Sequence, residues 1–128
     1  MATGLSAATA NSFLDALGNA TNYTADAEMW IKLHVGDPGA SAASNAAVET
    51  TRKQASLSAA ASGAITTDAA LTWTNVAGTE DFTHFSAWSA AAAGTFRLSG
   101  TVTANAVVAG DSFSVSTGDL DLSLSTAA

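Results

Sequence analysis

The chain lacks cysteine, has a single proline and carries only four basic residues, and each shortage excludes a class of protein. Without cysteine it can form neither a disulfide scaffold nor a cysteine-based zinc site. The four cations are outnumbered by 11 Asp and Glu residues, which leaves a formal net charge of -7. They are Lys32, Arg52, Lys53 and Arg97. Nucleic acid is therefore not an expected partner, because phosphate binding depends on clustered Lys and Arg.

Long hydrophobic runs are also missing. No stretch approaches the ~20 apolar residues of a membrane-spanning helix. The first residues, MATGLSAATANSF, have neither the basic region nor the apolar run of a secretory signal. We therefore expect no membrane partner.

Large hydrophobic side chains are scarce as well. Leu, Ile, Val and Phe account for only 24 of the 128 residues, because about half of the 48% hydrophobic fraction is alanine. A chain of this length forms one domain around one core. With only 12% of its residues charged it does not have the composition of a disordered protein. We expect a folded domain whose thin core is stabilised by oligomerisation or by docking onto a larger body.

What the chain does contain is the alternating pattern of half-buried β-strands. From residue 82 to residue 124 the runs FTHFSAWS, TFRLSGTVT, SFSVST and DLDLSLS are separated by glycine-containing turns. Leu120, Leu122 and Leu124 alternate with polar residues, as expected when one sheet face is buried and the other is wet. About seven to nine short strands at regular spacing predict an all-β fold, either a β-sandwich or jelly-roll-like.

A short helix is expected at the N-terminus, over residues 6–17. Ser6 or Thr9 can cap it, and Gly18 is placed to end it in the left-handed conformation. Its apolar residues fall on one stripe at helical spacing: Ala10, Phe13, Leu14 and Leu17. We therefore divide the chain into an N-terminal helical arm, residues 1–22, and a β-sandwich domain, residues 23–128.

Individual strands can be placed within that domain. The first covers Met29–Val35 and ends in a Gly-Asp-Pro-Gly turn. Residues 46–57 predict an edge strand, whose charged residues deter unwanted pairing. Residues 82–88 predict a central strand covered on both faces, with Phe82, His84 and Trp88 on one face and Phe85 and Ala87 on the other.

Side chains able to carry chemistry are few. His34 and Asp37 could bind a metal, but a metal site needs at least three converging ligands. We interpret them as a half-exposed strand histidine and a turn-forming aspartate whose side chain binds backbone N–H groups. His84 lies near Glu80 and Asp81 in sequence but lacks a defined nucleophile, so we expect a partly buried structural histidine.

The remaining acids and the tryptophans leave alternatives open. Five aspartates lie at loop or strand edges: Asp68, Asp81, Asp111, Asp119 and Asp121. They could bind calcium, and the last three could supply the carboxylates of a glycosidase. Because they lack EF-hand spacing, we interpret all five as solvated surface residues. Trp30, Trp73 and Trp88 could form a sugar-binding platform, although core or subunit contacts are the commoner use of tryptophan. We expect no enzyme, no catalytic residue, no metal and no cofactor.

One set of motifs resembles a family of small bacteriophage virion proteins, described as tail-fibre-like, minor tail or head decoration proteins. The motifs span residues 28–125 and comprise Leu33-His34-Val35-Gly36-Asp37-Pro38-Gly39, Asn45, Arg52, Trp73, Phe82–Trp88, Gly94 and Val107–Asp111. The resemblance implies a β-sandwich that sits on a virion and binds other copies of itself or a shell protein.

Size favours one role within this family, since the chain has no coiled-coil heptads and no long stalk. We expect a capsid decoration (minor capsid) protein on the capsid exterior, which binds the major capsid protein as a homotrimer and stabilises the shell. The alternative is a minor tail or tail-fibre-like protein with a carbohydrate-binding role at the host surface. The residues expected to contact partners are Phe13, Leu14, Leu17, Trp30, Arg52 and Lys53.

Overall fold

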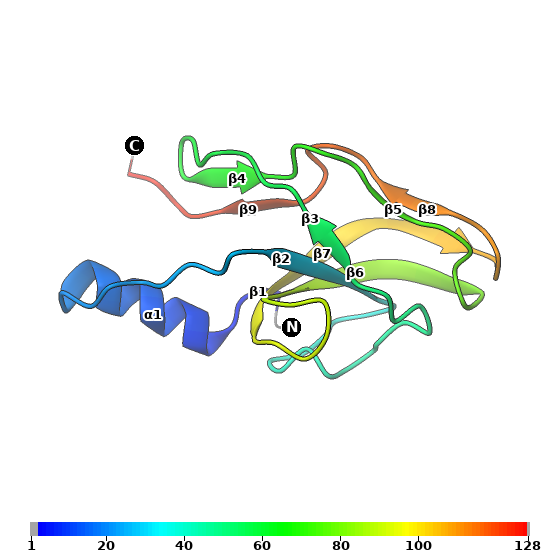
Figure 1. The fold of residues 1–128 in the computed structure, drawn as a ribbon, viewed down its shortest axis with the longest axis horizontal. Helices are drawn as coiled ribbons and strands as arrows, with labels where there is room; N and C mark the ends of the chain where they lie inside the picture. The colour runs from blue at the N-terminus through cyan, green and yellow to red at the C-terminus, as the bar shows by residue number, and fades with distance from the viewer. Residues whose placement is uncertain (1–2, 128) are drawn as a thin grey trace.

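The computed structural model describes residues 3–127, which form one N-terminal helix and nine β-strands (Figure 1). In chain order the elements are β1 (Gly4–Leu5), α1 (Ala7–Gly18), β2 (Met29–His34), β3 (Lys53–Ala55), β4 (Ala64–Thr66), β5 (Leu71–Trp73), β6 (Glu80–Trp88), β7 (Phe96–Val107), β8 (Phe113–Val115) and β9 (Asp121–Ser123). The predicted all-β fold with a short N-terminal helix is confirmed.

Three antiparallel sheets make up the β-structure. The largest has five strands in the order β1-β7-β6-β2-β3, and the other two are the pairs β4-β9 and β5-β8. In Figure 1 both pairs lie over the same face of the five-stranded sheet, which gives an open sandwich without barrel closure. β6 is the central strand, as its apolar residues on both faces predicted. β3 is the predicted edge strand, although it is shorter than residues 46–57.

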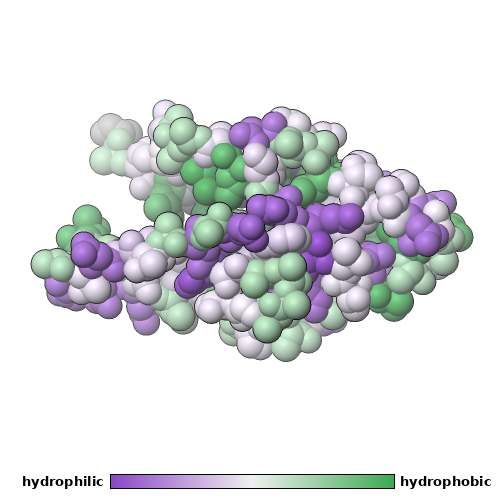
Figure 2. All heavy atoms as spheres, in the orientation of Figure 1, coloured by the Kyte–Doolittle hydropathy of each residue, from purple (hydrophilic) through white to green (hydrophobic). Residues whose placement is uncertain are grey.

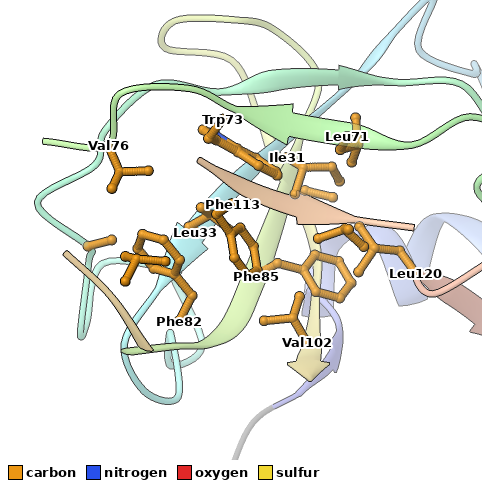
Figure 3. Packing of buried hydrophobic residues seen from close by; sticks show 14 of the residues in the cluster. Ile31, Leu33, Leu71, Trp73, Val76, Phe82, Phe85, Val102, Phe113 and Leu120 are labelled. Atoms are coloured by element: carbon orange, nitrogen blue, oxygen red, sulfur yellow. The ribbon is translucent and has the colours of Figure 1, made fainter. Parts of the chain in front are cut away.

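The core lies between the large sheet and the two strand pairs (Figure 3). Leu33 on β2 and Phe82 on β6 are fully buried, and Trp73 on β5 is 1% exposed. The ring of Phe113 on β8 joins these layers, because its centroid lies 5.9 Å from that of Trp73 and 4.9 Å from that of Phe82. Each such side chain contributes about 1.5 to 3 kcal/mol by its burial, so a few large residues hold together a chain rich in alanine.

A close approach between β6 and β7 requires a glycine. Phe85 pairs with Gly100 across the two strands. A Cβ atom at Gly100 would lie 2.6 Å from Cε1 of Phe85, which is shorter than any ordinary contact. The ring of Phe85 therefore occupies the space that a side chain on β7 would need.

The predicted end of the helix is wrong. Of the two predicted caps, Ser6 and Thr9, it is Ser6 that caps α1, but the helix continues through Gly18 and its C-cap is Asn19, with a φ of -120°. Asn19 closes the last turn because its N–H donates to the carbonyl of Asp15 and its Nδ2 donates to the Asp15 carboxylate at 2.7 Å. Ala20, and not Gly18, adopts a left-handed φ of 53°.

The predicted face of Phe82 is also wrong. Strict alternation placed Phe82 beside His84 and Trp88, on the face opposite Phe85. The structure buries Phe82 in the same core as Phe85, because the ladder between β6 and β7 has a register shift between Phe82 and His84. An irregularity of this kind breaks the alternation of side chains along a strand.

The turn after β2 folds the following loop back over the sheet. The carboxylate of Asp37 accepts the N–H of Gly39 at 2.9 Å, which confirms the predicted role of this aspartate. Gly39 has a φ of 75°, in the region that favours glycine. Asn45 then donates to the carbonyl of Asp37 at 2.8 Å, and its own carbonyl accepts the N–H of Val35. The loop is thereby fixed against the end of β2.

Candidate partner-binding surfaces

The base of the N-terminal arm is tied to the β-structure. β1 pairs with β7, and the N–H of Ser6 donates to the carbonyl of Arg97 at 2.7 Å. Thr9, one turn into α1, is only 2% exposed. Residues 4 and 5 thus belong to the five-stranded sheet, and α1 leaves this sheet from a fixed point. The division of the chain at residue 22 stays a prediction.

The far half of α1 borders an open apolar groove. Leu14 and Leu17 are 64% and 85% exposed, and Leu124 on the C-terminal segment is 55% exposed. Phe13 turns inward and packs edge-on against Tyr23, with 4.7 Å between the ring centroids. The groove has a volume of about 740 Å³, and its large lining side chains are Leu5, Phe13, Leu14, Leu17, Tyr23 and Leu124. We call it the arm groove. Figure 2 shows it as a hollow between α1 and the part of the molecule that contains the β4-β9 pair.

The arm groove continues inward into a second cavity of about 350 Å³. Met29, Leu98 and Leu122 line this cavity and belong to, or pack against, the sandwich core. One wall holds the ion pair of Arg97 with Asp26, in which Nε lies 2.6 Å from Oδ2 and Nη2 lies 2.7 Å from Oδ1. The hydrogen bonds to Asp26 raise the pKa of Arg97, and the opposite charges of the two side chains compensate each other. The sandwich is therefore left open at the end from which the arm extends.

A second surface lies on the face of the five-stranded sheet that points away from the core. Cross-strand pairing aligns Gln54 on β3 with Trp30 on β2, Trp30 with Trp88 on β6, and Trp88 with Phe96 on β7. The three aromatic side chains are half-buried. The guanidinium carbon of Arg52 lies 4.2 Å from the ring centroid of Trp88, which is a cation–π contact. We call these residues the aromatic row.

The six residues expected to contact partners thus fall into separate groups. Three line the arm groove (Phe13, Leu14 and Leu17), two lie in the aromatic row (Trp30 and Arg52), and Lys53 lies on the edge strand β3. Sequence reasoning missed Tyr23, Leu124 and Phe96, which complete the two surfaces. For Tyr23 the signal was a single aromatic residue in an otherwise polar stretch, but nothing local indicated what it packs against.

His34 is not the half-exposed histidine that was expected, because it is fully buried. Its Nδ1 lies 3.0 Å from the carbonyl of Ser44, in the loop that folds back over β2, and its Nε2 lies 2.8 Å from the hydroxyl of Ser86. Burial lowers the pKa of His34 below its ordinary value of 6.5, although the hydrogen bond to Ser44 opposes this. A neutral imidazole that donates from Nδ1 and accepts at Nε2 satisfies both contacts. The side chain has a structural role.

The other candidate groups are not brought together into a reactive site. The Nδ1 of His84 lies 2.8 Å from the Thr83 hydroxyl. The carboxylate of Glu80 accepts the N–H groups of Val48 and Glu49 at 2.7 and 3.2 Å. All five aspartates interpreted as solvated are exposed. Within residues 3–127 no three His, Asp or Glu side chains are grouped closely enough to hold a metal ion.

The described part of the chain contains no helix that is long and apolar enough to span a bilayer. Its features define a class: a small β-protein with an open apolar groove and an aromatic row on its surface. The sequence model of one family, described as "Podophage GP4 fiber I protein gp80", matches residues 4–123. The chain belongs to this family and is a structural protein of the bacteriophage virion. No curated protein matches it.

This family membership bears on the earlier interpretation. It confirms a phage virion protein, and the matched residues include nearly all of the segment that carried the resemblance. A fibre family agrees better with the tail-fibre alternative than with capsid decoration. Three points stay predictions: that the motif from Leu33 to Gly39 marks the family, that the chain forms a trimer, and which proteins it binds.

Proposed function

We propose that this chain is a non-enzymatic structural subunit of a podophage tail fibre. Several copies associate, three in the simplest arrangement that we expect, and the assembly is held on the virion through the arm of residues 1–22. The family match over residues 4–123 carries this proposal. The exposed apolar stripe of α1 supports it, because a large apolar patch marks a surface that is covered after assembly.

Several weak contacts are enough for such a role. Once one copy is attached, its neighbours bind at high effective concentration, so the assembly is held more firmly than any single arm. The net charge of -7 keeps separate subunits soluble before assembly. The work of this protein is therefore attachment, which requires neither a cofactor nor a reacting side chain.

Disruption of the gene tests this proposal. Electron microscopy of the resulting virions is expected to show filled heads on tails that lack fibres. The competing location is the capsid exterior, where the chain would bind the major capsid protein. In that case the fibres would remain and the heads would become fragile. Intact fibres on virions without this chain would contradict the tail-fibre proposal.

A second candidate function is carbohydrate binding at the host surface, and the aromatic row favours it. Half-buried tryptophans such as Trp30 present an apolar ring face and, at the edge, a polar N–H group. The indole N–H of Trp30 is fixed by the carboxylate of Glu28 at 2.8 Å. If the row binds glycans, Trp30→Ala abolishes adsorption of the labelled protein to host cells while Val48→Ala, at a separate exposed position, does not. Equal adsorption of both variants would contradict this function.

A further inference from the structure

We propose that the arm groove is the seat of helix α1 from a second copy of this chain. The proposal depends on the proposed function only in assuming that subunits associate, and it adds which surfaces meet. Each copy would insert the Leu14 and Leu17 side of its helix into the groove of a neighbour. The same helix would then serve as one wall of its own groove and as the occupant of the next.

The first argument is the gathering of exposed apolar side chains. In the part of the chain that the structure describes, six large hydrophobic residues are exposed, and three of them, Leu14, Leu17 and Leu124, border this one groove. Figure 2 shows hydrophobic residues on both sides of the hollow. The cavity beneath reaches core side chains such as Met29 and Leu122. An occupant would therefore complete the open end of the sandwich, which a chain with few large apolar residues leaves unfilled.

The second argument is charge, and it selects a second copy as the occupant. From residue 3 to residue 25 Asp15 is the only charged residue, in a chain whose net charge is -7. The excess of acidic groups makes two copies repel each other, but here they can meet through surfaces that carry almost no charge. The ion pair of Asp26 with Arg97, in the wall of the cavity beneath the groove, is internally compensated. A basic partner would find little to bind in this groove, whereas an uncharged apolar helix matches it.

The area that such a contact buries sets its strength. A helix of 12 residues is about 18 Å long and about 10 Å across, so the face that it presents covers on the order of 200 Å². In a reciprocal pair this face lies against the partner's groove, whose wall already includes the partner's own Leu14 and Leu17. The contact is therefore smaller than the roughly 800 Å² per partner of a stable interface. Two copies should associate weakly through it, at high protein concentration.

Replacing the two exposed leucines with asparagine tests whether α1 of a second copy occupies the arm groove. Because Leu14 and Leu17 are 64% and 85% exposed, L14N/L17N leaves the isolated fold intact. By sedimentation at about 100 µM, the unchanged chain should have the mass of a dimer or trimer and the variant that of a monomer. V108N is the matched control, since Val108 is 59% exposed and lies outside the groove lining. A monomeric unchanged chain, or a variant that keeps its oligomeric mass, would overturn the proposal.

Cross-linking then locates the contact, because the chain has no cysteine of its own. L17C is co-expressed with an affinity-tagged L124C chain and treated with a bismaleimide. The expected product joins the two different chains, and co-expression of A109C with the tagged L124C chain should give no such product. A cross-link from L17C in virions only to another virion protein would overturn the proposal in favour of that partner. A monomer that still locates to the tail would leave the proposed function standing and remove this inference alone.

Discussion

Arg97 and Asp26 form a two-pronged ion pair that joins the segment after α1 to strand β7. The two hydrogen bonds measure 2.6 and 2.7 Å, and both side chains are 19% exposed. Because the N–H of Ser6 also binds the backbone carbonyl of Arg97, this residue holds the chain on both sides of the helix. The pair thus fixes the arm relative to the sandwich and shapes the wall of the cavity beneath the arm groove.

Breaking this pair should loosen the arm. D26N removes the charge and leaves one oxygen to accept, so one of the two hydrogen bonds is lost, and we expect it to lower the free energy of unfolding by about 1 to 2 kcal/mol. R97Q should cost a similar amount, and the double variant less than the sum, with a coupling energy of about 1 kcal/mol. Chemical unfolding of the four proteins measures this cycle. Strict additivity would show that the ion pair does not hold the arm.

Gly100 should tolerate no side chain. G100A places a Cβ atom 2.6 Å from the ring of Phe85, and overpacking of this kind costs about 1 to 3 kcal/mol. G18A is the matched control, because a Cβ atom there meets nothing within 4 Å and α1 includes Gly18. Alanine in place of glycine stabilises a helix by up to about 1 kcal/mol. Thermal unfolding should therefore shift down for G100A and not for G18A; equal shifts would contradict the packing described for Phe85.

The buried His34 should make the fold sensitive to mild acid. Its pKa in the folded state lies below 6.5, so the unfolded chain binds a proton more readily as the pH falls through this value. The contribution of neutral His34 is complete above about pH 6.5 and is lost as the pH falls towards the folded-state pKa, at no more than about 1.4 kcal/mol per pH unit. Unfolding measured from pH 7.5 to pH 5 should show this loss.

Two variants isolate the effect of His34. H34Q removes the titrating group, so the slope of stability against pH in this window should become smaller, even if the protein is less stable throughout. H84Q removes the half-buried histidine that pairs with His34 across β2 and β6, and with it a charge that helps to lower the pKa of His34, so the slope should persist over a somewhat narrower pH range. If the slope disappeared in H84Q and persisted in H34Q, His84 on β6 would cause the acid sensitivity. That result would contradict the role given to His34 on β2.

Local patterns predicted much of the fold. Alternating residues located β2 and β6, charged residues marked the edge at β3, and Ser6 was one of the two residues predicted to cap the helix. The errors arose from contacts between distant parts of the chain. The register shift beside Phe82 depends on β7, and the burial of His34 depends on a loop that returns to cover it. Neither is encoded in the residues that flank these positions.

The candidate surfaces were predictable only in part. Phe13, Leu14 and Leu17 were identified from helical spacing, which a single segment reveals. The other wall of the arm groove includes Leu124, which is more than a hundred residues away in sequence. Spacing along the chain does not indicate that Leu124 lies near α1. Glu49 illustrates the same limit, since it is 6% exposed and accepts the N–H of Ala77 in a distant turn. Surfaces built from several segments appear only when the chain is folded.

The most direct test of the central claim, that this chain is a structural part of the tail fibre, is its position on the particle. Intact virions are labelled with gold-conjugated antibodies raised against the purified chain and imaged by electron microscopy. The account predicts gold at the tail, repeated at each fibre, with heads left unlabelled. Gold spread over the capsid shell would contradict it.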